Sequence, residues 1–286
     1  MANLKQIRAR IRTSKNIRQI TRAMKLVAAA RLKKAQDRVT EARPYSEKMR
    51  ELMLSLSSGG DLPTHPLLEK RSGTKTCLIM ISADRGLAGS YNTNLIRKAF
   101  DWLKEGGNTS DVFTVGKKGL QFFGKRGYHI AGSHTVPTAG AQYDDAVTVC
   151  KFAREKFESG EYDRIFICYS KFYSPIRQVP QIVQILPIEP PVTDEEPTAS
   201  KSYTFEPDAA SLLGTLLPKY LMNQVFQAML ESTASEHGSR MTAMTSATDN
   251  AGKMIESLTL KANRERQANI TKEILEVVGG AEALNG

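Results

Sequence analysis

The chain has 286 residues, of which 41% are hydrophobic and 24% charged, a composition typical of a globular protein and not of a disordered or fibrous one. Its net charge of +10 is uneven, because residues 1–50 carry 15 Lys and Arg against 3 Asp and Glu. The basic surface therefore belongs to the N-terminal segment. No run of eighteen apolar residues occurs, so the sequence predicts no direct insertion into a membrane.

Residues 3–57 are predicted to form one long helix. Apolar residues recur at intervals of three and four and predict a narrow stripe, comprising Leu4, Ile7, Ile11, Ile17, Ile20, Met24, Val27, Ala28, Leu32, Ala35, Val39 and Ala42. A narrow stripe suits a single partner helix, as in a coiled coil, and basic residues line the adjoining face. Pro44 is expected to kink this helix without ending it, because the apolar spacing continues to Leu56.

The pattern changes to alternating strands and helices from Thr76 onward. The strands are predicted at residues 76–82, 111–115, 128–131, 164–170 and 178–188, and the helices at 92–104, 117–125 and 141–158. Such alternation predicts a Rossmann-like α/β domain with a mostly parallel five-stranded sheet.

A Pro-rich acidic connector precedes a last helix, which is predicted over residues 208–284. Small side chains in its middle would let two helices approach closely. Both long helices join the same domain, so they are predicted to pair antiparallel. If their ends are level, paired residue numbers sum to about 265, which places Met24 beside Met241 and leaves everything after Asn263 unpaired.

The predicted division of the chain is therefore fourfold. It consists of an N-terminal coiled-coil helix (1–60), the α/β domain (74–190), a linker and foot (191–207) and a C-terminal coiled-coil helix (208–286).

Residues 82–90 follow a strand and precede a helix, where a phosphate-binding loop would lie. They match neither glycine-rich nucleotide motif, so a tight turn is the favoured interpretation. Cys77, Cys150 and Cys168 are widely spaced in apolar surroundings and are predicted to be buried thiols. Because no catalytic or metal-ligand spacing stands out, the sequence predicts a non-catalytic protein with no cofactor and no metal.

Three segments carry a resemblance to a known family. Residues 11–28, the turn at 84–87 and residues 236–250 followed by 266–271 resemble the γ subunit of F-type ATP synthases, in its bacterial form. The resemblance implies a rotating central stalk that couples proton or sodium flow through a membrane ring to ATP synthesis or hydrolysis at a hexamer of α and β subunits. Its implied partners are that hexamer, the ε subunit and the c-ring, at the cytoplasmic face of the bacterial plasma membrane, as a peripheral protein.

The resemblance also implies partner-binding residues. Met24, Lys25 and Arg240 would lie near the acidic loop of a β subunit. The hydrogen-bonding contact to another β loop would come from Arg266, Gln267 and Thr271, and the foot against the ring and ε from Tyr203, Phe205 and Glu206.

Two other classes of function stay open on the residues alone. A nucleic-acid-binding protein could use the basic helix against phosphates, although that helix has no aromatic residue before Tyr45. A nucleotide-dependent enzyme could use the α/β domain. Salt-dependent DNA binding and equilibrium binding of ATP or NAD would discriminate these classes.

Overall fold

The computed structural model describes residues 4–58, 65–106, 110–137, 140–189 and 209–285. The chain forms two compact units: unit 1 comprises Met1–Val27 with Met241–Gly286, and unit 2 comprises Ala28–Arg240. Two long helices, α1 (Leu4–Ser58) and α5 (Ala209–Asn285), each contribute to both units. Both agree with the predicted helices to within about one residue at each end, and both continue past an internal proline, Pro44 in α1 and Pro218 in α5.

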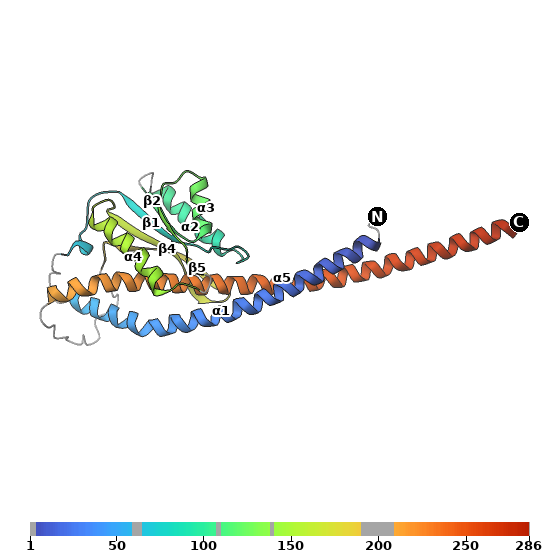
Figure 1. Ribbon diagram of the computed structural model, residues 1–286, viewed down its shortest axis with the longest axis horizontal. Coiled ribbons are helices and arrows are strands. Elements are labelled where there is room, and N and C mark those ends of the chain that lie inside the picture. The colour runs from blue at the N-terminus through green and yellow to red at the C-terminus, as the bar shows by residue number, and fades with distance from the viewer. Residues whose placement is uncertain (1–3, 59–64, 107–109, 138–139, 190–208, 286) are drawn as a thin grey trace. The chain divides into compact units, whose positions relative to one another are not determined.

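Unit 2 contains the α/β domain. Its elements, in chain order, are η1 (Pro66–Leu68), β1 (Thr76–Ile81), α2 (Tyr91–Glu105), β2 (Ser110–Val115), α3 (Lys117–Lys125), β3 (Ile130–His134), α4 (Tyr143–Glu158), β4 (Arg164–Ser174) and β5 (Arg177–Leu186) (Figure 1). The strand order is β3-β2-β1-β4-β5, and only the pairing of β4 with β5 is antiparallel. The prediction of a Rossmann-like, mostly parallel five-stranded sheet is therefore confirmed.

The sheet is covered by helices on both faces, as Figure 1 shows. Leu78 and Met80 of β1 face α2 and α3, whereas Cys77, Ile79 and Ile81 face the core shared with α4, α5 and part of α1. A central strand buried on both faces needs apolar side chains at every position, which explains the continuous apolar run of β1.

The part of α5 within unit 2 is buried on nearly all sides. Leu217, Leu221 and Val225 have no exposed surface, and Ala228 and Met229 are at most 3% exposed. A helix that is apolar around its whole circumference belongs in the core of a protein. This half of α5 is therefore a core element of unit 2.

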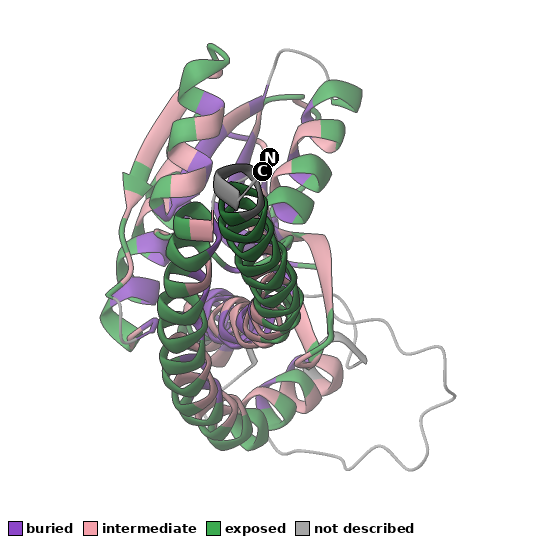
Figure 2. Ribbon diagram, turned by 90° about the vertical axis from the view of Figure 1, so that its right-hand side faces the viewer, coloured by how far each residue is buried: buried purple, intermediate pink, exposed green. Residues whose placement is uncertain are grey.

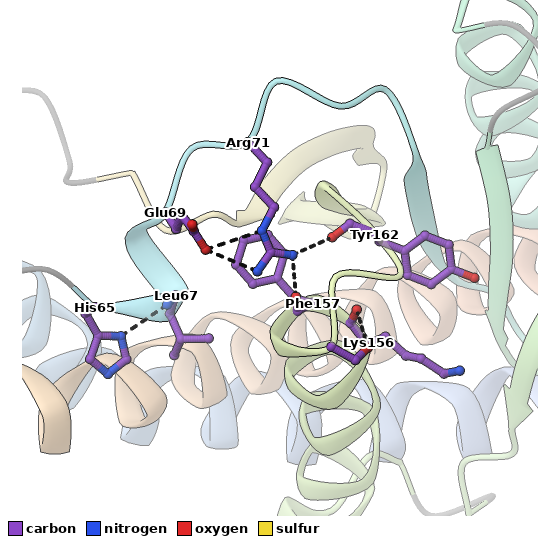
Figure 3. A network of polar contacts seen from close by, with 8 residues as sticks. His65, Leu67, Glu69, Arg71, Lys156, Phe157 and Tyr162 are labelled. Carbon is purple, nitrogen blue, oxygen red and sulfur yellow. Dashed lines mark hydrogen bonds and ion pairs between the residues drawn. The ribbon is translucent and has the colours of Figure 1, made fainter.

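Residues 65–75, which precede β1, cross the C-terminal end of α4 and are held there by Arg71 (Figure 3). The Arg71 guanidinium donates to the carbonyls of Phe157 at 2.6 Å and Tyr162 at 3.4 Å, and pairs with Glu69 at 3.2 Å. It also lies 4.5 Å from the centre of the Phe157 ring. Arg71 thus ties the last turn of α4 and the loop after it to the residues that lead into β1.

In unit 1 the N-terminal part of α1 pairs with the C-terminal part of α5. Ser14 Oγ donates to Met254 Sδ at 3.4 Å, and Thr248 Oγ1 donates to Thr21 Oγ1 at 2.8 Å. These long-range contacts confirm the antiparallel pairing. The paired numbers sum to 268 or 269, so the predicted sum of 265 is wrong by about one helical turn.

The register changes the expected neighbours of two residues. Met24 lies opposite residues 244–245 and not beside Met241, and Leu4 lies opposite residues 264–265. In unit 2 the same register continues, because Ser46 Oγ donates to Asn223 Oδ1 at 3.0 Å.

The side chains in the seam of unit 1 also differ from those predicted. Ile17, Ile20 and Val27 were expected in the seam but are 47%, 59% and 52% exposed, whereas Ser14 and Thr21 are buried. The positions of α1 that contact α5 alternate between spacings of three and four residues, as in a coiled coil. Some of these positions, such as Ser14 and Thr21, hold polar residues. The prediction considered only apolar residues and therefore selected the neighbouring face of α1, which carries Ile17, Ile20 and Val27.

Among the described residues, no helix carries an apolar stretch long enough to cross a membrane.

The register is testable by engineered cysteines. Thr21→Cys with Thr248→Cys should form an intramolecular disulfide on mild oxidation, because the two native hydroxyls lie 2.8 Å apart. The pair Met24→Cys with Met241→Cys is the control and should cross-link much less. Peptide mapping without reductant measures both yields, and a higher yield for the control pair would contradict the register.

The role of Arg71 is testable by unfolding. Arg71→Ala should lower the free energy of unfolding by about 2 kcal/mol, because buried carbonyls lose a charged donor. The neighbouring Lys70→Ala removes only an exposed 3.9 Å contact with Glu189 and should change it by less than about 0.5 kcal/mol. Equal effects of the two changes in denaturant titrations would mean that the carbonyl contacts contribute nothing specific.

Candidate partner-binding surfaces

The crevice between the carboxyl ends of β1 and β4 is where open α/β sheets of this order usually bind ligands, because the strand order reverses there. In this chain α5 occupies it. The Ser170 N–H of β4 donates to Ser232 Oγ at 3.1 Å, and Ser235 Oγ donates to the Ser170 carbonyl at 2.9 Å. Ser239 Oγ donates to the Ala88 carbonyl, after β1, at 2.7 Å. The crevice is thus filled by buried serines of the chain's own helix.

The loop that follows β1 uses its polar groups to hold the start of α3. Asp84 Oδ1 accepts from the Lys117 N–H at 2.9 Å, and Ser82 Oγ accepts from the Gly119 N–H at 2.9 Å. Gly116 has a φ of +94°, and a Cβ there would lie 2.1 Å from the Ser82 carbonyl oxygen, so only glycine fits. These amides at the start of α3 are therefore already bound within the chain and are not available to a phosphate.

A charged cluster lies on α5 beside this loop. Glu236 and Arg240 form an ion pair at 2.6 Å, and Arg240 also approaches the Gly86 carbonyl at 3.4 Å and His237 Nδ1 at 3.2 Å. Burial, with the positive charges of Arg240 and Arg31, lowers the pKa of His237 to about 4, so this ring is neutral near pH 7. Burial raises the pKa of Glu236, and the Arg240 charge opposes that shift.

Arg240 is therefore mostly engaged within its own unit. Its side chain is 11% exposed, although the resemblance assigns it to a partner subunit. The small residues of α5 also face elsewhere than expected: beyond the serines above, a Cβ on Gly238 would lie 3.3 Å from Phe172 and Pro175 of the β4–β5 hairpin. In unit 2 the small residues allow α5 to pack closely against the sheet. Helical spacing alone did not indicate this contact.

Unit 1 exposes two apolar surfaces. The first lies on α1, where Ile17, Ile20, Leu26 and Val27 are 47–63% exposed. Met24 and Lys25, both predicted to bind partners, are partly buried beside them. At about 100° per residue Ile17, Ile20 and Val27 share one face of α1, whereas Leu26 points away from it. A face with several exposed apolar residues is typical of an interaction surface.

The second surface is the end of α5. At the observed register Arg266 and all residues after it lie beyond the first residue of α1, and residues 266–281 are exposed (Figure 2). Five large apolar side chains there are 48–72% exposed: Ile270, Ile274, Leu275, Val277 and Val278.

The predicted residues Arg266, Gln267 and Thr271 lie on this end of α5 and are exposed. Gln267 and Thr271 are one turn apart on one face, and Thr271 Oγ1 donates to the Gln267 carbonyl at 3.0 Å. Arg266 points about 100° away from Gln267. Tyr203, Phe205 and Glu206 fall outside the described residues.

Chemistry of other kinds has little support among the described residues. They contain no group of three or more His, Cys, Asp or Glu that could hold a metal ion. Burial raises the pKa of Cys77 and Cys168 to about 12 and that of Cys150 to about 11. These three thiols are buried and unpaired, as predicted, and are poor nucleophiles in this state.

Comparison with known proteins identifies the family. A family model described as ATP synthase matches residues 3–284. The chain is 46% identical over 287 residues to the ATP synthase gamma chain of Pelotomaculum thermopropionicum, covering 99% of this chain and 100% of the relative. It is 44% identical over 284 residues to that of Brevibacillus brevis, covering 98% of each chain.

Solved structures share the fold. A chain in the cryo-EM structure of the Euglena gracilis mitochondrial ATP synthase with OSCP, F1 and c-ring superposes with a TM-score of 0.68 at 19% identity, covering 98% of this chain and 94% of that one. A chain of the central stalk and c-ring assembly of the Tetrahymena thermophila mitochondrial enzyme gives a TM-score of 0.60 at 23% identity, covering 80% of this chain and 99% of that one. Nearly full-length matches at both levels leave one assignment: this chain belongs to the family of ATP synthase gamma chains, the central stalk subunits of F-type ATP synthases.

Proposed function

We propose that this chain works as a rotating shaft that is not itself catalytic. It would couple proton or sodium flow through a membrane ring to ATP synthesis or hydrolysis at a hexamer of α and β subunits. In this proposal it is a peripheral protein on the cytoplasmic face of a bacterial plasma membrane, and its further partners are ε and the c-ring.

The observation that carries the proposal is the unpartnered end of α5. A helix with five large apolar side chains exposed over residues 270–278 is unfavourable in water and calls for a surrounding surface. A sleeve formed by six subunits would supply that surface on every side of the helix.

The proposed contacts of the shaft differ along its length. Arg266, Gln267 and Thr271 would bind a β loop by hydrogen bonds, and their exposure leaves them free to reach it. Met24 and Lys25 would face an acidic β loop, together with the apolar stripe of Ile17 and Ile20. Arg240 would contribute only if its pair with Glu236 opened.

The mechanism follows from asymmetric contact. The shaft would press on one β subunit at a time. Each rotary position would then stabilise a different set of conformations of the three β subunits, and these conformations would differ in their affinity for nucleotide. Coupling then equals the difference in contact free energy between rotary positions, and the shaft needs no nucleotide of its own. The filling of the ligand crevice by Ser232, Ser235 and Ser239 supports this division of work.

Contacts with ε and the c-ring would involve Tyr203, Phe205 and Glu206. The solved structures that share this fold come from assemblies that include a c-ring.

Met24→Lys tests the proposed contact of Met24 and Lys25 with an acidic β loop. The substitution adds a positive charge beside Arg22 and Lys25. The new lysine would bind a carboxylate of a β subunit in one rotary position. A new ion pair of about 1 kcal/mol would favour that position roughly fivefold and lower coupling efficiency. Assembly should persist, and Met24→Leu should behave as wild type. Ions pumped per ATP in reconstituted vesicles are the measurement, and an unchanged ratio for Met24→Lys would count against the contact.

A truncation series tests the unpartnered end of α5. Deleting residues 276–286 should leave assembly and ATP-driven rotation largely intact, because it removes apolar packing and spares Arg266, Gln267 and Thr271. A deletion back to Asn263 should be worse, because those residues and the end of the helix pair are also lost. Rotation and ATPase rates of each assembled complex decide the matter. Complete loss of both at the shorter deletion would mean that the tip itself drives rotation.

A further inference from the structure

An open groove of about 580 Å³ lies within unit 2, between α1, α5 and the first residue of α4. Neither the turn after β1 nor the exposed surfaces of unit 1 contribute to it. Its volume falls within the range of pockets that hold small molecules in proteins.

Aromatic side chains from three helices form the walls of the groove. They are Tyr45 of α1, Tyr143 of α4 and Phe226 of α5. Tyr143 and Phe226 meet edge to face with ring centres 5.8 Å apart. Tyr45 and Tyr143 are 52% and 57% exposed, which is unusual for two large rings that border one hollow.

The groove is kept open by small and fixed residues beneath these rings. Ala42 presents only a methyl group from α1. Asn223, 8% exposed, accepts at Oδ1 from Ser46 Oγ at 3.0 Å, which ties α5 to α1 at this level. The hollow therefore has defined walls and a hydrogen-bonded base.

Two donors at the groove give it a preference for negative charge. Lys219 is exposed, and no carboxylate of the described residues forms an ion pair with it. Asn223 lies four residues later on the same face of α5; its Oδ1 accepts from Ser46, and its Nδ2 is the donor group of the same amide. An ammonium and an amide one turn apart match a carboxylate, phosphate or sulfonate group.

We propose that this groove binds a small anionic amphiphile, a molecule with an apolar body and a single negatively charged group. The body packs between the rings of Tyr45, Tyr143 and Phe226, and the anion contacts Lys219 and Asn223. The three helices that line the groove would be bridged by such a ligand. Binding would therefore stabilise unit 2, since a ligand that binds only the folded state raises its stability.

The test uses the full chain and two fluorescent probes of nearly equal shape, anilinonaphthalene sulfonate, which is anionic, and phenylnaphthylamine, which is neutral. Phe226→Ala should weaken both probes about tenfold, because a wall is lost. Lys219→Met keeps the apolar stem and should weaken only the anionic probe, by about fivefold. Lys253→Met, an exposed lysine of the same helix that does not line the groove, should change neither.

A second variant distinguishes loss of the binding site from loss of folding. Ala42→Phe fills the groove from α1 without removing a wall and should abolish probe binding while circular dichroism stays unchanged. Competition by decanoate and by naphthoate then separates a fatty-acid ligand from an aromatic acid.

Three results would overturn the proposal. The first is probe binding that Phe226→Ala and Ala42→Phe leave unchanged. The second is an equal loss with Lys219→Met and Lys253→Met, which would indicate non-specific charge. The third is stoichiometric displacement of the probe by purified ε subunit, which would make the groove a protein interface. None of these results bears on rotation, so the proposed function stands or falls separately.

Discussion

The arrangement of unit 2 follows from the burial of α5 at its centre. A single helix has to satisfy the sheet, α1 and α4 at once, so it is apolar at Leu217, Leu221 and Val225 and changes to small hydroxyl residues where it reaches the strand ends. Ser232, Ser235 and Ser239 pair with backbone groups of β4 and of the turn after β1, each bond being worth about 1 kcal/mol. Larger side chains at these positions would separate the helix from the sheet. The fold thus uses for internal support a crevice that related sheets use for ligands.

The helix pair in unit 1, unlike the core of unit 2, has polar residues at its contact and apolar residues on its surface. Its seam contains the hydroxyls of Ser14 and Thr21, while Ile17, Ile20 and Val27 face outward. A seam of this kind gains less from the hydrophobic effect than one of leucine and isoleucine. The outward apolar residues favour contact with other chains, and the end of α5 after Glu265 has no partner in the described chain at all. Both features suit a helix pair that works inside an assembly, which fits the gamma chain family.

Much of the fold and part of the site could be predicted from the sequence. The five strands and the long helices follow from changes of apolar period, and the apolar run of β1 correctly indicates a strand buried on both faces. The exposure of Ile270 and Ile274 follows from helix length, because α5 is longer than any partner segment in α1. The division into four domains stays a prediction, and so do the roles of Met24, Lys25, Arg266, Gln267 and Thr271, because those roles concern contacts with other chains.

The order of elements, the sheet type and the antiparallel pairing of the long helices could all be predicted from the sequence, because they depend on local periodicity and on chain connectivity. Which face of each long helix is buried depends instead on how the folded elements pack. Ile17 and Thr21 both fit a helical spacing, and the packing against α5 selects Thr21. Likewise, nothing local indicates that Arg240 approaches the Gly86 carbonyl or that Ser239 meets Ala88, 151 residues away in the chain. Such contacts are set by the close packing of whole elements, which a pattern within one segment does not contain.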